Sequence, residues 1–235
     1  MKRPIVSIIL PAYNERENLM QLIPAIFSQT VLLDHWRVEI LVVDDNSPDG
    51  TAQALAKKFG RRVRLIVRAH DRGLGTAIGD GVRASKGSVI VGMDADGNHN
   101  PIYIPALLAT LAHADFVVGS RYISGGGMAQ SMQYTISYLA NMFIRSACGF
   151  PVYDNTSGFY AIYTKHLYAI GISRIYQGYG DYHLRLVWFV KKAGLRIQEI
   201  PVYYAPRYYG QSKSRLFIML FTYVKTVIQL RLKMI

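Results

Sequence analysis

The chain has 235 residues, 51% of them hydrophobic, which is enough for one substantial core and favours a single large domain. Its one cysteine, Cys148, excludes an internal disulfide framework and fits a reducing compartment, so we expect a cytoplasmic location. The net charge of +12 favours an anionic partner, such as nucleic acid, a lipid headgroup or a phosphorylated substrate. No stretch reaches the roughly 20 consecutive apolar residues that span a bilayer, so the protein can lie on a membrane but is not expected to cross it.

Strands and helices are predicted to alternate in the first half of the chain. Apolar, β-branched runs at residues 5–10, 38–43, 63–67 and 88–93 are each followed by a segment compatible with a helix. This alternation predicts βαβ units, and right-handed crossovers then give a mainly parallel, twisted sheet with helices on both faces. Such an α/β sheet binds ligands at the carboxyl ends of its strands. A further strand is expected at residues 115–119.

The second half begins with a glycine-rich loop at residues 124–127 and an amphipathic helix at about 132–148. A strand near 156–163, a helix near 182–192 and a strand at 195–203 are expected next, and a helix from about 214 to 233 closes the chain. We expect residues 1–213 to form one catalytic domain that includes the amphipathic helix, and residues 214–235 to form a C-terminal amphipathic interface helix.

An acidic pair follows the fourth predicted strand. Asp94 and Asp96 flank Ala95 where an apolar run ends, so both carboxylates can project from one strand terminus. In isolation, such a pair is more often a solvated turn or a helix cap. Two anions this close are nevertheless suited to Mg²⁺ or Mn²⁺, which takes a few carboxylate ligands and accepts phosphate oxygens of a nucleotide diphosphate for the remainder. We therefore predict a metal site that stabilises a departing diphosphate.

Other polar residues are predicted to meet this pair at the same edge of the sheet. Tyr13 and Glu15 follow the first strand, Asp45 ends the second, and Arg121 ends the fifth. Asp45 can accept hydrogen bonds from a ribose or a base, with Tyr13 as a packing surface and Glu15 as a further acceptor. This convergence favours a binding site over scattered turns.

Three basic residues, Arg121, Arg207 and Lys213, suit a diphosphate, because guanidinium groups bind phosphate oxygens in bidentate fashion and lysine adds a point charge. For Arg207 and Lys213 a solvated basic loop is an equally good interpretation. The glycines Gly73 and Gly75 do not follow the first strand, so we expect a tight turn and close helix packing there and no phosphate cradle. The histidines show no metal-ligand spacing and are expected in loops or at the surface.

With these residues identified, the chain resembles family-two glycosyltransferases, and among them the dolichol-phosphate or polyprenol-phosphate mannose synthases. The shared segments are ILPAYNEREN at residues 9–18, VVDDNSPDGT at 42–51, GLGTA at 73–77, MDAD at 93–96, HNP at 99–101, GSRY at 119–122, TSGF at 156–159 and GQSK at 210–213. Each segment is a moderate signal, and their order along nearly the whole chain is a strong one.

The resemblance implies a GT-A type fold and the transfer of mannose from GDP-mannose to a polyprenyl or dolichyl phosphate with inversion, as in protein glycosylation. By position, the nucleoside would be bound by Pro11, Tyr13, Glu15, Val43 and Asp45, the metal diphosphate by Asp94, Ala95 and Asp96, and the donor and acceptor phosphates by Arg121, Arg207 and Lys213. Two positions depart from the pattern. Asn98 stands where some relatives carry a glutamine metal ligand, and Gln133 stands where several carry an arginine. Asn98 is therefore a third candidate metal ligand, with a shorter reach.

Several alternatives remain open from the sequence. A phosphate acceptor has a second pKa of about 6 and is already an anionic nucleophile, so it needs no catalytic base. The nearest alternative is a polyprenyl-phosphate glucosyltransferase that uses UDP-glucose. Transfer to a hydroxyl would need a carboxylate base near Arg121 or Asp181, and no clear candidate stands there. A basic nucleic-acid binder or an inactive scaffold fits the acidic strand ends poorly, so no nucleic-acid partner is expected.

The final predicted helix is too apolar for a solvated one, since its polar residues form only a narrow stripe. It could lie in the bilayer interface with its basic residues at anionic headgroups, pack against a separate transmembrane subunit, or simply cover one face of the sheet. From residue 207 onward the chain has six basic residues and no acidic one. We therefore expect a peripheral protein that contacts the cytoplasmic face of a membrane.

Overall fold

The structure, a computed structural model, describes residues 3–129, 131–210 and 216–232. Its strands are β1 (Ile5–Ala12), β2 (Arg37–Asp44), β3 (Arg64–Val67), β4 (Val89–Gly92), β5 (Phe116–Ser120), β6 (Gly127–Met128), β7 (Tyr160–Tyr163), β8 (Ile197–Pro201) and β9 (Tyr203–Tyr204). Its helices are α1 (Arg16–Thr30), α2 (Thr51–Phe59), α3 (Leu74–Ala84), α4 (Ile104–Leu111), α5 (Ser131–Cys148), α6 (Thr164–Ile170), α7 (Ile172–Ile175), α8 (Tyr182–Lys192) and α9 (Leu216–Arg231), with short 3-10 helices at Gly60–Arg62 and Pro101–Tyr103. The predicted boundary between residues 213 and 214 lies outside the described residues.

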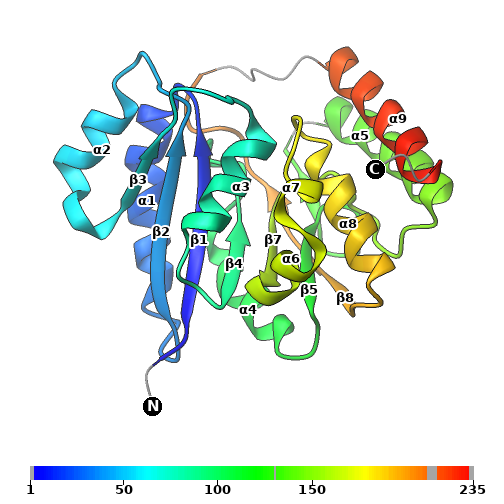
Figure 1. Ribbon diagram of the computed structural model, residues 1–235, viewed down its shortest axis with the longest axis horizontal. Helices are drawn as coiled ribbons and strands as arrows, with labels where there is room; N and C mark the ends of the chain where they lie inside the picture. The colour runs from blue at the N-terminus through cyan, green and yellow to red at the C-terminus, as the bar shows by residue number, and fades with distance from the viewer. Residues whose placement is uncertain (1–2, 130, 211–215, 233–235) are drawn as a thin grey trace.

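Within the described residues, seven strands form one sheet in the order β3-β2-β1-β4-β7-β5-β8 (Figure 1). Strands β1 to β4 pair in parallel, as does β5 with β8, whereas β7 runs antiparallel to both β4 and β5. The mainly parallel α/β sheet predicted from the alternating pattern is confirmed. The insertion of an antiparallel strand between β4 and β5 was not predicted, nor was the short parallel pair of β6 and β9.

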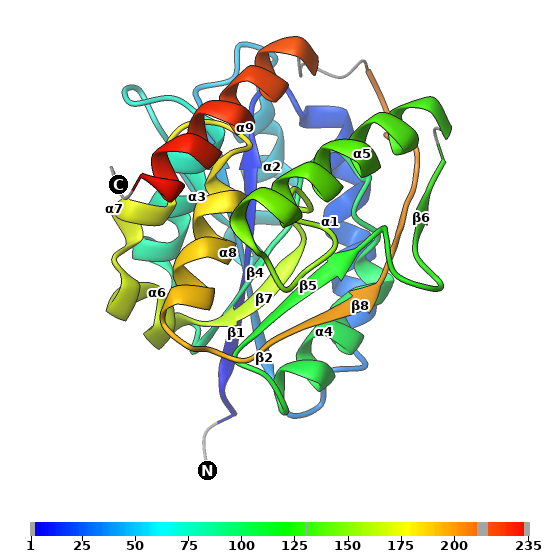
Figure 2. The same ribbon diagram turned by 90° about the vertical axis from the view of Figure 1, so that its right-hand side faces the viewer.

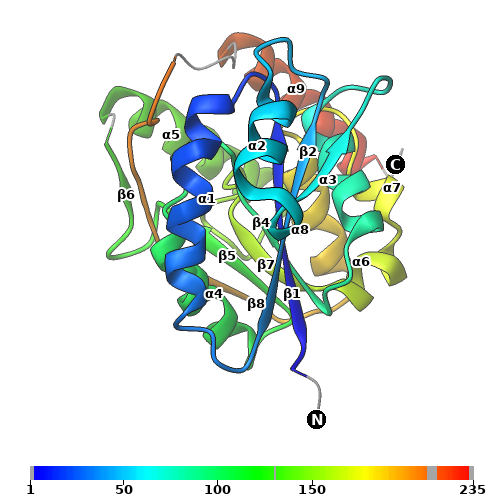
Figure 3. The same ribbon diagram turned by 90° about the vertical axis from the view of Figure 1, so that its left-hand side faces the viewer.

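Helices cover both faces of this sheet, as Figure 3 shows with α1 and α4 on one side and α3, α6 and α7 on the other. The strands are apolar on both faces, so alternate residues enter separate cores. In β1, Ile8 and Leu10 pack in the core beneath α1, α2 and α4, while Ile9 packs in the core beneath α3 and α8. This two-sided burial explains why the strand sequences are continuous apolar runs rather than alternating ones.

Helices α5 and α9 contact each other at one end of the molecule, where α9 also packs against α8 (Figures 1 and 2). None of the helices in the described ranges combines the length and the apolar character that a bilayer span requires. The C-terminal helix packs against α5 and α8, and only Tyr223, Thr226, Val227 and Leu230 of its described side chains are buried.

The later predicted elements needed larger corrections than the early ones. The strand expected at 156–163 begins only at Tyr160, because the preceding residues form a loop that bends over the end of β5. The strand expected at 195–203 is divided into β8 and β9 at Val202, whose backbone N–H donates to the Ser120 carbonyl. These corrections matter for the site, since both segments line or support it.

Candidate active site

A cavity of about 590 Å³ opens at the carboxyl ends of β1, β2 and β4. The cavity is also lined by the start of α3, residues 156–158, the start of α8, and Met219 and Tyr223 of α9. The residues predicted for the site that line this cavity are Pro11, Tyr13, Glu15, Asp45, Asp94, Ala95, Asp96, Asn98 and Arg207. The fold thus brings together side chains from three strand ends and from the loop after β9, as expected for a parallel sheet.

Three predicted residues are not among those that line the cavity. Val43 is fully buried in the core next to α3, so its side chain offers no surface to a nucleoside. Arg121 is buried in an ion pair described below. Lys213 lies outside the described residues. Val43 and Arg121 therefore do not present their side chains to the cavity, and their predicted roles in binding the donor stay predictions.

The acidic pair is fixed by a turn directly after β4. Gly97 has a φ of +87°, in the left-handed region that glycine adopts at little cost, so the chain can reverse after Asp96. The backbone N–H and the side-chain amide of Asn98 donate to the two carboxylate oxygens of Asp96, each over 3.0 Å. The Asp94 N–H donates to Nδ1 of His99 over 2.8 Å. Asn98 thus orients Asp96, and its predicted role as a metal ligand stays a prediction.

The electrostatics of this turn favour a bound cation. Removal of water raises the pKa of Asp94 to about 6, and Glu15 adds to the rise while Arg207 opposes it. Burial, followed by repulsion from Asp94, also raises the pKa of Asp96. Arg207 offsets part of the negative charge, because its Nη2 lies 2.7 and 2.9 Å from the Glu15 carboxylate oxygens and its Nη1 lies 3.4 Å from Asp96 Oδ2.

Within the described ranges, no group of three or more His, Cys, Asp or Glu side chains is arranged to hold a metal ion by itself. The donor set at the turn consists of carboxylate oxygens, which hard divalent cations prefer. Asp94 and Asp96 therefore fit such an ion if water or substrate oxygens supply the other ligands.

His183, buried in α8, corrects the expectation of a loop or surface position, whereas His99 lies in the loop after β4 as expected but is buried. His99 is fully buried, with its ring stacked on Phe159 at a centroid distance of 5.0 Å and edge-on to Tyr204 at 4.6 Å. His183 lines the cavity, and its Nδ1 donates to the Asn155 carbonyl over 2.8 Å. Burial lowers the pKa of each to about 4, so both rings are neutral at pH 7. A single histidine carries no periodic signal of its own, which is why sequence reasoning missed the burial of both rings.

The carboxylate of Asp45 is fixed by hydrogen bonds, one of them from the buried Arg68. Arg68 donates its Nε to Asp45 Oδ1 over 2.7 Å, and the Gly73 N–H donates to Asp45 Oδ2 over 2.8 Å. A Cβ at Gly75 would lie 2.6 Å from the Gln177 carbonyl oxygen, so this glycine permits close packing of α3. The turn-and-packing interpretation of the glycines agrees with these contacts. The contact of Asp45 with a ribose or a base stays a prediction. It would use carboxylate lone pairs that these two hydrogen bonds do not occupy.

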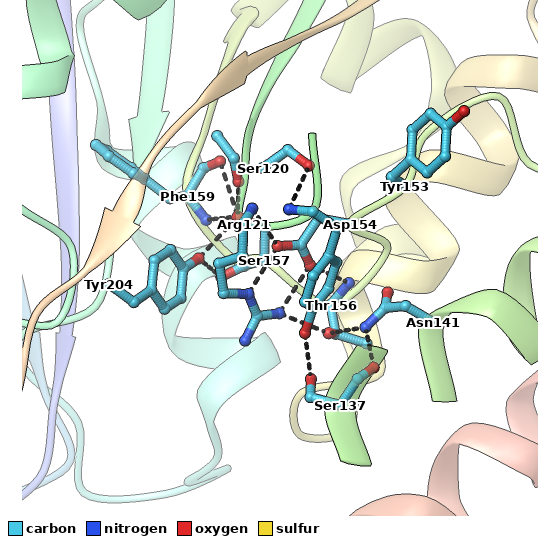
Figure 4. Close-up of polar contacts among 12 residues, drawn as sticks. Ser120, Arg121, Ser137, Asn141, Tyr153, Asp154, Thr156, Ser157, Phe159 and Tyr204 are labelled. Atoms are coloured by element: carbon cyan, nitrogen blue, oxygen red, sulfur yellow. Dashed lines mark hydrogen bonds and ion pairs between the residues drawn. The ribbon is translucent and has the colours of Figure 1, made fainter. Parts of the chain in front are cut away.

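Arg121 lies beneath the cavity wall in a buried ion pair (Figure 4). Its Nε and Nη2 donate to Oδ2 and Oδ1 of Asp154, each over 2.7 Å, and its backbone N–H donates to the same carboxylate over 3.0 Å. The two side chains are 8% and 0% exposed. Burial opposes the charged form of Arg121, but Asp154 outweighs this and keeps its pKa above the ordinary value. The guanidinium therefore acts as an internal group of the wall.

Sequence reasoning missed Asp154 and Asn141, which connect this wall to α5 (Figure 4). Asn141 is 1% exposed and donates to Thr156 Oγ1 over 2.9 Å. The segment 156–159 was singled out by resemblance, but no chemical role could be given to it without its partners. The signal available in the sequence was Asp154, a charged residue close to that segment.

Helix α9 contributes to the cavity and to the outer surface at once. Met219 and Tyr223 line the cavity, and Thr226 donates to Asp181 Oδ2 over 3.1 Å. Asp181 also pairs with Arg185, so it is engaged and not available as a base. The side chains of α5 and α9 that remain exposed and apolar are Met132, Tyr138, Leu139, Met142, Phe143, Phe221, Val224 and Ile228.

Residues 7–171 match the model of the family described as Glycosyl transferase family 2. The chain is 35% identical to polyprenol monophosphomannose synthase of Mycolicibacterium smegmatis over 88% of this chain and 79% of that protein. It is 34% identical to undecaprenyl-phosphate mannosyltransferase of Micrococcus luteus, over 88% of this chain and 86% of that protein. Dolichol-phosphate mannosyltransferase of Pyrococcus furiosus is 32% identical over 89% of this chain, which spans 59% of that longer protein.

Solved structures with the same fold include glucosyl-3-phosphoglycerate synthase from Mycobacterium tuberculosis in complex with Mn²⁺, UDP and glucosyl-3-phosphoglycerate. The TM-score is 0.72 at 19% identity, and the match covers 97% of this chain and 80% of that one. At this identity the likeness shows the GT-A type fold alone. Together with the family match over most of the described sheet, these comparisons show that the chain belongs to glycosyl transferase family 2 and is a glycosyltransferase.

Proposed function

We propose that this glycosyltransferase transfers mannose from GDP-mannose to a polyprenyl phosphate with inversion, giving polyprenyl-phosphate mannose and GDP. The observation that carries the proposal is the similarity, over 88% of this chain, to enzymes named for mannosyl transfer to polyprenol or undecaprenyl phosphate. The cavity of about 590 Å³ is within the usual range for a small-molecule site. The exposed ring of Tyr13 and the fixed carboxylate of Asp45 supply a packing surface and an acceptor for the nucleoside.

A divalent cation, Mg²⁺ or Mn²⁺, is proposed at Asp94 and Asp96, with Asn98 as a neighbouring oxygen donor. The raised pKa values of both carboxyl groups are consistent with this, because burial disfavours their charged forms and a bound cation would offset that effect. The related fold crystallised with Mn²⁺ is consistent with the choice. When bound, such an ion would supply positive charge for the leaving diphosphate.

The reaction follows from the charges of the substrates. An oxygen of the acceptor phosphate forms a bond to the anomeric carbon, and the bond from that carbon to the diphosphate oxygen breaks with its electron pair. No proton has to be removed from the acceptor, so the reaction needs no carboxylate base. The hydrogen bonds that already occupy Asp154 and Asp181 therefore do not prevent it. The task of the protein is then to align the two phosphates and to stabilise the departing charge, for which Arg207 at the cavity edge is suited.

The acceptor is proposed to come from a membrane surface. The exposed apolar side chains of α5 and α9 lie on contacting helices, beside the cavity wall formed by Met219 and Tyr223. Such a surface suits the interfacial region of a bilayer, with the polyprenyl chain in the lipid and its phosphate at the cavity. We propose peripheral binding at the cytoplasmic face, alone or with a transmembrane partner subunit.

The test is transfer of labelled sugar from GDP-mannose to a short polyprenyl phosphate in detergent, with Mg²⁺ or Mn²⁺ and with chelator. We expect labelled lipid only with the metal, and a loss of at least about 100-fold in Asp96→Ala, because a carboxylate at the diphosphate site is removed. Asp34→Ala, in an exposed loop away from the cavity, is the matched control. Labelled lipid formed from UDP-glucose instead would show that UDP-glucose is the donor. No transfer from either donor would refute the proposal.

A further inference from the structure

The hydroxyl group of Thr156 is held by two hydrogen-bond donors at the cavity wall (Figure 4). Arg121 Nη2 donates to Thr156 Oγ1 over 3.0 Å, and Asn141 Nδ2 donates to it over 2.9 Å. A hydroxyl group has one hydrogen and two acceptor lone pairs. Both lone pairs of the Thr156 hydroxyl oxygen therefore accept hydrogen bonds, and its hydrogen remains to be donated.

The direction of these bonds is fixed by chemistry. Asn141 Oδ1 accepts from the Asn155 backbone N–H over 2.7 Å, and its Nδ2 also donates to the Ser137 carbonyl over 2.9 Å. A backbone N–H cannot accept and a carbonyl cannot donate, so the amide of Asn141 has one possible orientation. Arg121 has no acceptor atom in its guanidinium. Thr156 must therefore accept from both neighbours and can donate to neither.

The hydroxyl hydrogen of Thr156 is left for a ligand. Thr156 is partly exposed and lines the cavity together with Ser157 and Gly158, and no described residue accepts a hydrogen bond from it. The position that a Cβ on Gly158 would occupy is 3.8 Å from Asp94 Oδ1, so this wall borders the acidic pair. A hydroxyl that accepts from a cation is polarised and becomes a stronger donor, which favours an anionic oxygen as its partner.

We propose that Thr156 binds a phosphate oxygen of a substrate through its hydroxyl hydrogen, and that Arg121 and Asn141 are positioning residues for it. The inference rests on the proposed function in so far as a phosphate group enters the cavity. Arg121 then acts on the phosphate through Thr156, because Asp154 already neutralises its charge. Both the acceptor phosphate and the nucleotide diphosphate offer this chemistry, and the experiment separates them.

The test compares Thr156→Val, which keeps the size but removes the hydroxyl, with Thr156→Ser, which keeps the hydroxyl. We expect kcat/KM to fall about 10- to 100-fold in the valine variant, the usual effect of losing a hydrogen bond to a charged group. The serine variant should stay within about threefold of wild type, since its donor is retained. Thr164→Val is the control, because Thr164 donates to the Gly87 carbonyl over 2.7 Å outside the cavity.

Calorimetric titration with GDP and with a short-chain polyprenyl phosphate keeps the outcome independent of turnover. Weaker binding of the lipid phosphate alone in Thr156→Val assigns Thr156 to the acceptor, and weaker binding of GDP alone assigns it to the donor. Unchanged affinities, or a serine variant as impaired as the valine variant, overturn the proposal. A wild-type chain that binds both ligands but transfers no mannose contradicts the proposed reaction and leaves the assignment of Thr156 measurable.

Discussion

Removal of Asp154 is expected to destabilise the fold strongly, because it leaves a buried cation without its partner. In Asp154→Ala the guanidinium of Arg121, only 8% exposed, loses both 2.7 Å hydrogen bonds to the carboxylate. Breaking a buried pair from one side costs about 3–5 kcal/mol. For a chain of this size, each kcal/mol lowers the Tm by about 2–4 °C, so we expect a fall of about 6–20 °C in thermal unfolding followed by circular dichroism.

The matched control is Asp115→Ala, which removes the partner of Arg196. That arginine is 66% exposed, so water replaces the lost contact and the cost should stay below about 1 kcal/mol. A double variant, Arg121→Met with Asp154→Leu, should recover much of the lost stability, since neither charge then remains buried. If Asp154→Ala costs no more than Asp115→Ala, the buried pair is not the structural element inferred here.

Four further outcomes follow from the structure. Affinity for Mn²⁺, measured by titration in the absence of donor, should fall as the pH drops below about 6, where Asp94 becomes protonated, and a flat profile would contradict its raised pKa. The same shift should make the metal-free protein lose stability as the pH rises from 3.8 through about 6, because the folded state holds this proton more tightly. Gly75→Ala should cost about 1–3 kcal/mol in urea unfolding, since its Cβ would meet a backbone oxygen at 2.6 Å, and a neutral effect would show that α3 can shift. Phe221→Asp, at a side chain 73% exposed, should leave the Tm unchanged but weaken binding to anionic vesicles about 10-fold or more, and undiminished binding would exclude α9 from the contact.

The central sheet could be predicted because its strands are buried on both faces. Continuous apolar runs at β1, β2 and β4 mark such strands without any knowledge of their neighbours. The direction of β7 could not be predicted in this way. It depends on pairing Tyr160 with Gly92 and with Val118, contacts between distant segments that leave no local pattern.

The candidate site likewise contains residues whose positions could be predicted from the sequence and residues whose positions could not. Asp94, Asp96 and Asp45 follow strands directly, so the position of each could be read from the strand end. The partner of Arg121 lies 33 residues further along the chain and reaches it only because the loop before β7 folds over β5. A basic residue at a strand end is therefore ambiguous in sequence, since it can face a ligand or an internal acid.

The position of α9 constrains how this enzyme can be altered. Its 16 residues include a cavity wall on one side and exposed apolar side chains on the other. Removal of the helix to obtain a more tractable protein would open the cavity at Tyr223 as well as remove the apolar surface. Substitutions confined to outward positions such as Phe221, Val224 and Ile228 would instead change the exposed apolar surface, the proposed membrane contact, while the wall stays intact. Under the proposed function, the inner face of this helix would serve catalysis and its outer face membrane contact, so each could be altered without the other.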